Sequence, residues 1–187
     1  MYYKYLEGEK IYLREVRDSD VNEDYYNWLN DPEIYQFLET RFFPRSQNDI
    51  LNYVRKLAAN PNEIFFAICD KGTEKLIGNI KLGPINWVHR KGDISLLIGN
   101  KEYWGKGIGT EAIGLVTKFA FETLNLNKVC AGYYESNIGS EKACKKLGFI
   151  DEGIYRKEYF LNGKYVNIIR VGLLRMEWEE INSKSKE

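Results

Sequence analysis

Three glycines occupy alternate positions in residues 103–112, at Gly105, Gly107 and Gly109. An alternating apolar run over residues 93–99 precedes them, and a helix-like run over residues 110–124 follows. Glycine lets the backbone turn tightly and leaves its N–H groups uncovered. A helix start adds unpaired N–H groups and the positive end of the helix dipole. The order of strand, glycine turn and helix start therefore predicts an anion site suited to a pyrophosphate.

Spacing argues against two well-known phosphate loops. A Walker-type loop needs Gly-Lys-Ser/Thr at its end, and this tripeptide is absent from the sequence. The dinucleotide fingerprint places its third glycine three positions after the second. Here Gly109 follows Gly107 by two positions, and no βαβ pattern precedes it. A glycine-rich turn before a core helix remains the structural alternative to a phosphate site.

Three segments resemble the GCN5-related N-acetyltransferases (GNAT). Residues 104–109, Trp-Gly-Lys-Gly-Ile-Gly, are similar to the family's acetyl-CoA loop, Arg/Gln-x-x-Gly-x-Gly/Ala, with Trp104 where Arg or Gln is commoner. Residues 135–149 resemble the second signature, in which Asn137 stands at a strand-to-helix junction and a short helix leads to Gly-Phe. Residues 28–33, Trp-Leu-Asn-Asp-Pro-Glu, resemble a branch that contains ribosomal-protein N-terminal acetyltransferases and amino-sugar N-acetyltransferases. The resemblance runs from about residue 11 to residue 178.

This resemblance implies an α/β fold of the mixed α+β kind. Its central, mostly antiparallel sheet would splay between the fourth and fifth strands, with helices on both faces. One acetyltransferase domain would span residues 1–187, with its core at about 10–178. The implied enzyme transfers the acetyl group of acetyl-CoA to a primary amine by direct attack in a ternary complex. The acceptor would be a small molecule such as an amino sugar, or a protein N-terminal amine.

The same fold could instead serve as a non-catalytic sensor or partner module that binds acyl-CoA. Two departures from the family pattern support this alternative, Trp104 in the loop and Cys144 in the following helix. The presence of all three loop glycines and of Asn137 favours the enzyme.

The composition of the chain argues against several classes of protein. The 187 residues suit one domain, and 27 basic against 27 acidic residues predict no general attraction to nucleic acid or to an anionic membrane. Three cysteines without metal-ligand spacing predict reduced thiols in a cytoplasmic protein. The sequence contains no signal peptide and no long apolar run, which predicts a protein that is neither secreted nor membrane-spanning. The single histidine, His89, argues against histidine-rich metal sites, so no metal is expected, and a homodimer is left open.

Hydrophobic periodicity and turn residues place the elements around these motifs. Ser46 is the expected N-cap of a helix before the main sheet, and Asn162-Gly163 is the expected hairpin turn. Another helix is expected over residues 21–29, capped by one of residues 18–20, and the polar tail from residue 177 should fray. Strands are expected at residues 10–16, 63–70, 75–82, 93–99, 128–135, 153–160 and 165–176.

By the family resemblance, coenzyme A would lie along the central strand and the glycine loop. Backbone groups of the strand end would bind the pantetheine arm, together with the side chain of Asn137. The loop amides and the Lys106 side chain would bind the pyrophosphate. The expected cofactor-binding residues are Leu97, Ile98, Gly99, Trp104, Gly105, Lys106, Gly107, Ile108, Gly109, Thr110 and Asn137.

Acetyl transfer needs a neutral amine, a donor for the thioester oxygen and a proton for the departing thiolate. Glu135 and Asp93, at strand ends beside the splay, are candidate bases, and solvated charges are the alternative reading. Many family members carry a tyrosine seven residues after Asn137, where this sequence has Cys144. Cys144 is a candidate acid, although its apolar helix face favours a core thiol. Ser140, water, or a nearby tyrosine acting through water could serve instead, the tyrosines being Tyr133, Tyr134 and Tyr155.

The acceptor would bind beside the helices that precede the sheet. The aromatic residues there are candidates for its lining, and core packing is the alternative for each. His89 has a suitable intrinsic pKa but lies in a loop of unknown position, where a surface histidine is the default. The candidate acceptor residues are Tyr25, Trp28, Tyr35, Phe42 and His89.

Overall fold

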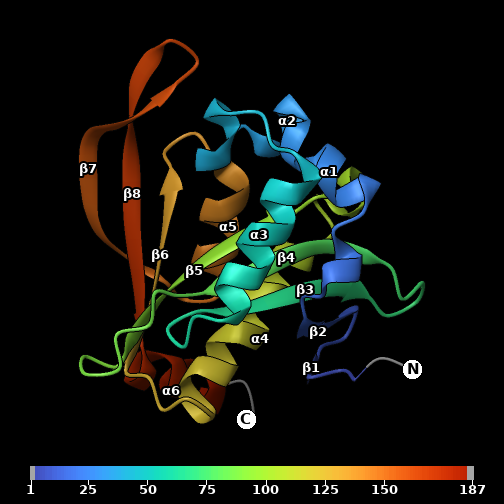
Figure 1. Ribbon diagram of the computed structural model, residues 1–187. Helices are drawn as coiled ribbons and strands as arrows, with labels where there is room; N and C mark the ends of the chain where they lie inside the picture. Colours follow the sequence, from blue (N-terminus) through green and yellow to red (C-terminus); the bar gives the residue numbers. More distant parts are fainter. Residues whose placement is uncertain (1–2, 185–187) are drawn as a thin grey trace.

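The computed structural model describes residues 3–184 and is built on one eight-stranded sheet (Figure 1). The strand order is β1-β2-β3-β4-β5-β6-β8-β7, and every neighbouring pair is antiparallel except β5 and β6. The strands are β1 (Leu6–Glu7), β2 (Ile11–Glu15), β3 (Ile64–Asp70), β4 (Leu76–Leu82), β5 (Lys91–Ile98), β6 (Lys128–Tyr134), β7 (Ile150–Leu161) and β8 (Lys164–Leu174). This mixed sheet confirms the predicted fold class.

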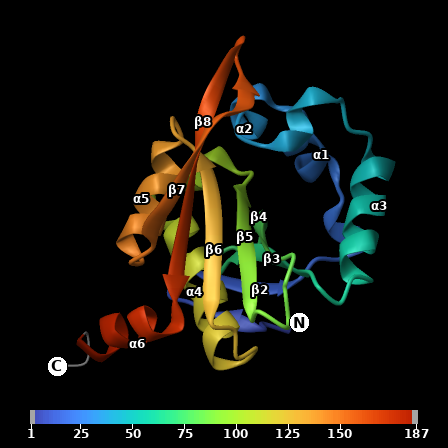
Figure 2. The same cartoon turned by 90° about the vertical axis from the view of Figure 1, so that its left-hand side faces the viewer.

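Helices cover both faces of the sheet, as predicted. In Figure 2 the strands β5 and β6 stand between α1 and α3 on one side and α4 and α5 on the other. The helices are α1 (Glu23–Asn30), α2 (Pro32–Tyr35), α3 (Gln47–Ala58), α4 (Ile108–Glu122), α5 (Ile138–Lys146) and α6 (Arg175–Lys184), with short 3₁₀ turns η1 (Asp18–Asp20), η2 (Glu39–Phe42) and η3 (Lys101–Tyr103). Within residues 3–184 none of these helices combines the length and the apolar character that a bilayer crossing requires.

The central strands β3 and β4 are buried on both faces, which explains their nearly continuous apolar sequences. The main core lies between the sheet and α4, whose buried residues include Ile113, Val116 and Phe119. Each such side chain contributes about 1.5–3 kcal/mol on burial. A smaller cluster around Tyr25 and Trp28 packs α1 on the opposite face. The sheet is therefore packed on both faces, by α4 on one side and by α1 on the other.

The separation occurs between β5 and β6. Their parallel pairing runs only from Lys91 opposite Lys128 to Ile94 opposite Ala131. Beyond this point β5 continues to Ile98 and β6 to Tyr134 without pairing to each other. This is the predicted splay between the fourth and fifth strands, which are numbered fifth and sixth here because the short strand β1 was not anticipated.

Local signals placed several boundaries correctly. Ser46 caps α3 and forms a reciprocal capping box with Asp49. Asn162 and Gly163 turn the β7–β8 hairpin with φ of 49° and 80°, the positive values that such a two-residue turn requires. The expected cap of α1 was wrong: residues 18–20 form η1, and Asn22 caps the helix by accepting from the Tyr25 N–H.

The C-terminal segment differs from the prediction. The last strand ends at Leu174, and α6 occupies most of the tail that was expected to fray. The ring of Trp178 packs against Phe121 of α4, with centroids 5.5 Å apart. Only a few apolar side chains, the partly buried Trp178 and Ile181 beside Gly148, dock this otherwise polar helix, and so its apolar periodicity was weak. The remainder of the predicted tail, residues 185–187, lies outside the described residues.

Candidate functional site

The glycine loop forms an open cradle at the start of α4. Gly105 and Gly107 have φ of 70° and 82°, and a Cβ added at either would meet no atom within 4 Å. Gly107 is the N-cap residue and gives α4 no side-chain cap. None of the N–H groups of residues 105–110 donates a hydrogen bond to another residue in the described part of the chain. These groups and the helix dipole suit an anion, so the cradle fits a pyrophosphate.

Three contacts hold the loop in place. The indole Nε1 of Trp104 donates to the Ile98 carbonyl at 2.8 Å, which ties the loop to the splayed end of β5. The Glu111 carboxylate accepts from the Lys10 N–H at 2.9 Å and fastens α4 to the start of β2. The Lys10 ammonium donates to the Lys106 carbonyl at 3.1 Å. The loop is therefore fixed by the surrounding elements, while its own N–H groups stay available.

The backbone groups of β5 point alternately toward β4 and toward the gap left where β5 and β6 separate. We call this gap the opening. The Gly83 N–H donates to the Asp93 carbonyl at 2.7 Å, and the Gly99 N–H donates to the Ile77 carbonyl at 2.9 Å. Asp93 and Gly99 thus turn toward β4, and by the two-residue period of a strand so does Leu97. The groups of Leu96 and Ile98 face β6 and the opening. Of the three residues expected to bind the pantetheine arm, Leu97 and Gly99 thus direct their backbone groups to β4, and Ile98 directs its groups to the opening.

Asn137 lies at the open end of β6, at the N-cap of α5. Its Oδ1 accepts from the Ser140 N–H at 3.1 Å, whereas its Nδ2 donates to no other described residue. The helix cap therefore fixes the side chain and leaves one donor available. Ser140 lies in the first turn of the same helix.

Cys144 lies inside the main core. Its side chain is 2% exposed, and burial raises the pKa of the thiol to about 11. A thiol in this position lacks access to solvent, and its surroundings are those of a packing residue.

The side chain of Asp93 lies on the face of the sheet that carries α1 and α3, which we call the helix-side face. It lies in the paired part of β5, next to the opening. This face is identified by Asn79, which donates to the Tyr25 hydroxyl of α1 and stands opposite Leu97. Leu97 and Asp93 share a face because they are four residues apart on one strand. Asp93 stands opposite Cys130, in the paired half of β5 and β6, and its carboxylate accepts a hydrogen bond from Arg170 of β8.

Glu135 follows the last residue of β6 and is held by one partner on β8. Its two carboxylate oxygens accept from the backbone N–H of Asn167 at 3.0 Å and from the Asn167 side chain at 2.8 Å. The Glu135 N–H also donates to the Asn167 carbonyl at 3.1 Å. Glu135 thus lies at the open end as predicted, with both oxygens engaged.

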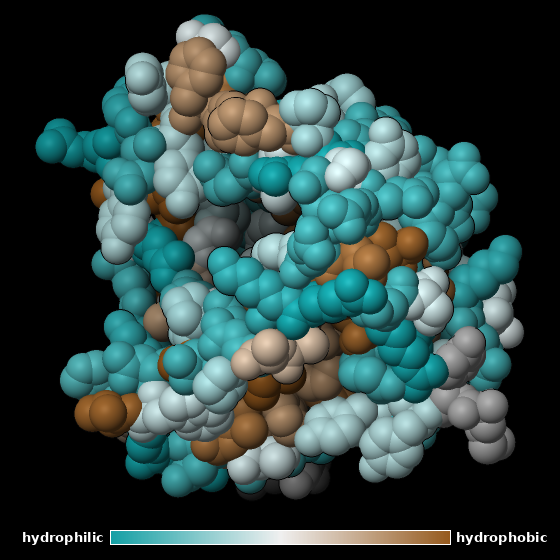
Figure 3. All heavy atoms as spheres, in the orientation of Figure 1, coloured by the Kyte–Doolittle hydropathy of each residue, from teal (hydrophilic) through white to brown (hydrophobic). Residues whose placement is uncertain are grey.

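The helix-side face of the sheet is hollowed beside the opening. Figure 3 shows a recess between the β7–β8 hairpin and the helices, and Ser95 and Gly132 are exposed there although they lie in central strands. We call this hollow the helix-side recess and define it by Asp93, Ser95, Gly132, Tyr134 and the segment Glu39–Phe42 opposite them.

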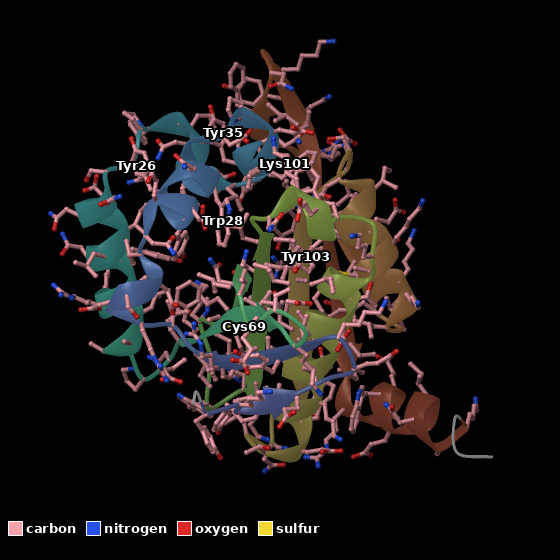
Figure 4. All side chains as sticks on the ribbon, turned by 90° about the vertical axis from the view of Figure 1, so that its right-hand side faces the viewer. Tyr26, Trp28, Tyr35, Cys69, Lys101 and Tyr103 are labelled. Atoms are coloured by element: carbon pink, nitrogen blue, oxygen red, sulfur yellow. The ribbon has the colours of Figure 1, made fainter. Side chains whose placement is uncertain are left out.

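The aromatic residues predicted to line the acceptor site differ in their exposure to solvent. Tyr25 is 2% exposed and bonded to Asn79, whereas Phe42 is 48% exposed at the rim. Figure 4 shows Trp28 and Tyr35 on the helical side of the sheet, beside the segment after β5 that carries Lys101. A Cβ on Gly99 would collide with the Trp28 ring, so this indole packs directly on the end of β5.

His89 does not join these residues. It lies in the loop before β5, at the paired end of that strand, and its N–H donates to Asn86 Oδ1 at 2.8 Å. The opening starts at the other end of β5, beyond the four paired residues 91–94. His89 therefore lies apart from the other residues predicted to line the acceptor site.

Sequence reasoning missed two charged residues of the recess, Glu39 and Arg41. The hydroxyl of Tyr134, the last residue of β6, donates to the Glu39 carboxylate, and Arg41 Nη1 lies 3.1 Å from the same carboxylate. Burial, followed by this hydrogen bond, raises the pKa of Tyr134. Glu39 and Arg41 belong to no family motif and precede β6 by about ninety residues, so the sequence offered no signal for them.

Within residues 3–184, no group of three or more histidine, cysteine or acidic side chains is arranged to hold a metal ion.

Comparisons with known proteins bear on this arrangement. A family model described as an acetyltransferase (GNAT) domain matches residues 10–150. A probable N-acetyltransferase of Bacillus subtilis is 31% identical over 166 residues, which cover 84% of this chain and 90% of that protein. An uncharacterized N-acetyltransferase of Bacillus licheniformis is 29% identical over 177 residues, covering 92% and 97%. The crystal structure of the Vibrio cholerae spermidine N-acetyltransferase with CoA and spermine matches with a TM-score of 0.81 at 26% identity, covering 91% of this chain and 98% of that one.

Proposed function

Because the chain belongs to the GNAT family of acetyl-CoA-dependent acetyltransferases, we propose that it acetylates the primary amine of a small molecule by direct attack in a ternary complex. The observation that carries the proposal is the opening between β5 and β6. The phosphate cradle lies at its rim, and the helix-side recess leads to it from the other side. Donor and acceptor can therefore meet at the opening, where positioning supplies much of the rate.

On the donor side, the chain contributes fixed backbone groups. The N–H groups of residues 105–110 would bind the pyrophosphate, with the Lys106 side chain adding a positive charge nearby. The Leu96 N–H and carbonyl and the Ile98 N–H, which face β6, would bind the pantetheine arm and the thioester oxygen, since the Ile98 carbonyl is taken by Trp104. The free donor of Asn137 would bind a pantetheine amide. Acetyl-CoA itself supplies a thioester, which is an activated acyl group.

On the acceptor side, we assign the base role to Asp93. Its carboxylate lies on the recess face, two residues below the start of the opening, and Arg170 fixes its orientation. At this separation a water molecule can carry the amine proton to the carboxylate. Glu135 remains the second candidate, but Asn167 engages both of its oxygens.

We assign water as the group that donates a proton to the departing thiolate. Cys144 is buried and its thiol pKa is raised to about 11, so it is a poor donor to a group in the opening. A thiolate is a fair leaving group and needs only modest assistance. The cysteine then packs α5 against the main core, consistent with its apolar surroundings.

A peptide amine is a second candidate acceptor, favoured by the exposed aromatic rim of the recess. Phe160 and Tyr165 at the hairpin tip are 45% and 62% exposed, and Phe42 on the opposite wall is 48% exposed. Such a rim could hold the residues that follow an N-terminal amine.

The test is thiol release from acetyl-CoA over a panel of amines, with thermal stabilisation by acetyl-CoA measured in parallel. The panel includes amino sugars, simple monoamines, diamines, polyamines and short peptides. Turnover on a small amine together with stabilisation is the expected result. Stabilisation without turnover on any amine would favour a binding module, and turnover on peptides alone would favour the N-terminal acceptor.

A further inference from the structure

Arg41 is the centre of a polar and aromatic cluster in the wall of the helix-side recess. Its Nη1 donates to the Leu38 carbonyl at 2.7 Å and to the Glu39 carboxylate at 3.1 Å. Its Nη2 donates to the Phe160 carbonyl at 2.6 Å, which joins η2 to the β7–β8 hairpin across 119 residues of sequence. The side chain is 9% exposed, so this cation is largely removed from bulk water.

Aromatic rings surround the same guanidinium. Its central carbon lies 4.2 Å from the ring centroid of Phe42 and 5.1 Å from that of Tyr134. Phe37 and Tyr159 pack against Tyr134, with centroids 5.6 and 5.4 Å away. Aromatic faces beside a carboxylate are the features that bind an organic ammonium group. In this protein the chain's own arginine already occupies them.

The other two carboxylates at the recess, Asp93 and Glu135, also have hydrogen-bond donors within the protein. Asp93 accepts from Arg170, and Glu135 accepts from Asn167. The described residues therefore offer a second ammonium group of an acceptor no unpartnered carboxylate at this face. Two arginines already occupy the Glu39 and Asp93 carboxylates that a second ammonium group would need.

We propose that Arg41 determines acceptor specificity by excluding amines that carry a second positive charge. The recess would then admit a single attacking amine whose remaining part is neutral or anionic. This inference rests on the proposed function and narrows its substrate class. It also predicts a preference different from the polyamine named for the Vibrio cholerae relative.

The experiment compares two acceptors with the same attacking group, 1,4-diaminobutane and its mono-N-acetyl derivative. They differ in the second positive charge, so the ratio of their kcat/KM values reports its exclusion. The wild type should favour the monoamine. Arg41→Ala should raise the diamine-to-monoamine ratio about tenfold or more, because it leaves the Glu39 carboxylate and the neighbouring aromatic faces free to bind the second ammonium group. If neither compound is a substrate, the ratio is taken from their inhibition constants against the best acceptor of the amine panel.

Two further variants separate the effect of the Arg41 charge from the effect of the hydrogen bonds by which Arg41 links η2 to the hairpin. Arg41→Lys keeps the charge but loses the planar fork that bridges two carbonyls, so it should keep the low wild-type ratio. Glu39→Gln leaves the Arg41 charge unneutralised and should lower the ratio further, which provides a test even if Arg41→Ala folds poorly. Arg55→Ala, on the exposed face of α3 beside Asp18, is the matched charge control and should change nothing.

An unchanged ratio in a folded Arg41→Ala protein would overturn the proposal. So would a shift of the same size in Arg41→Lys and Arg41→Ala, because Arg41 would then act only as a strut between η2 and the hairpin. Failure of the proposed function is distinct from both outcomes: the wild type would bind acetyl-CoA but acetylate no amine of the panel.

Discussion

Gly107 offers a test in which backbone strain and ligand contact can be separated. It has φ of 82° and ψ of 2° at the N-cap of α4, and a Cβ there would meet no atom of the protein within 4 Å. Gly107→Ala therefore causes no clash in the free protein. Its cost in stability is the left-handed backbone conformation, about 1–2 kcal/mol for a residue with a Cβ.

The effect on coenzyme A should be larger and of a different kind. The added methyl group would occupy the cradle and push the pyrophosphate away from the N–H groups of Gly107 and its neighbours. Losing one hydrogen bond to a charged group costs about 1.5–3 kcal/mol. At 1.4 kcal/mol for each factor of ten, coenzyme A affinity should fall about tenfold to a hundredfold. Gly107→Glu adds a repelling charge and should abolish measurable binding.

Gly163 is the matched control. It has φ of 80°, a Cβ there would also meet no atom within 4 Å, and it lies in the hairpin turn away from the cradle. Gly163→Ala should lose a similar amount of stability but keep wild-type affinity. Calorimetric titration with coenzyme A and thermal melts measure the two quantities. Affinity of Gly107→Ala within twofold of the wild type would refute the cradle, as would equal affinity losses in both variants.

Four other predictions concern Trp104, Asp93 and Cys144. Trp104→Phe keeps the ring but loses the hydrogen bond to Ile98, about 0.5–1.5 kcal/mol, so the Kd for acetyl-CoA should rise several-fold; an unchanged Kd would remove this anchor. Asp93→Asn should lower kcat about a hundredfold with an unchanged Kd for acetyl-CoA, and undiminished kcat would return the base role to Glu135. Cys144→Ala should keep kcat within a few-fold, and a loss above a hundredfold would restore it as the acid. Because burial raises the pKa of Cys144 from 9.0 to about 11, the folded state retains the proton more strongly, so its stabilising effect is complete below pH 9 and is lost between pH 9 and 11. Urea unfolding at pH 8 and pH 10 should therefore show the wild type losing about 1 kcal/mol more than Cys144→Ala.

Local sequence was sufficient for features whose geometry is local. The tight glycine turn at Gly105 and Gly107, the cap at Ser46 and the Asn162-Gly163 turn each depend on a few adjacent residues. Steric limits on φ and the hydrogen bonds of a helix end act over one turn of chain, so composition and spacing predict them. The motif order along the chain then indicated the family and, through it, the splayed sheet.

Tertiary structure alone decided which side chains meet at the opening. Asp93 contacts Arg170, 77 residues away, and Glu39 contacts Tyr134, 95 residues away. Strand register determines the first pair and the docking of η2 against β6 determines the second. Register also decided that Leu96 and Ile98, rather than Leu97 and Gly99, turn their backbone groups to the opening, since a shift of one residue reverses every group on a strand. These choices depend on the packing of the whole sheet, and for that reason no short stretch of this sequence records them.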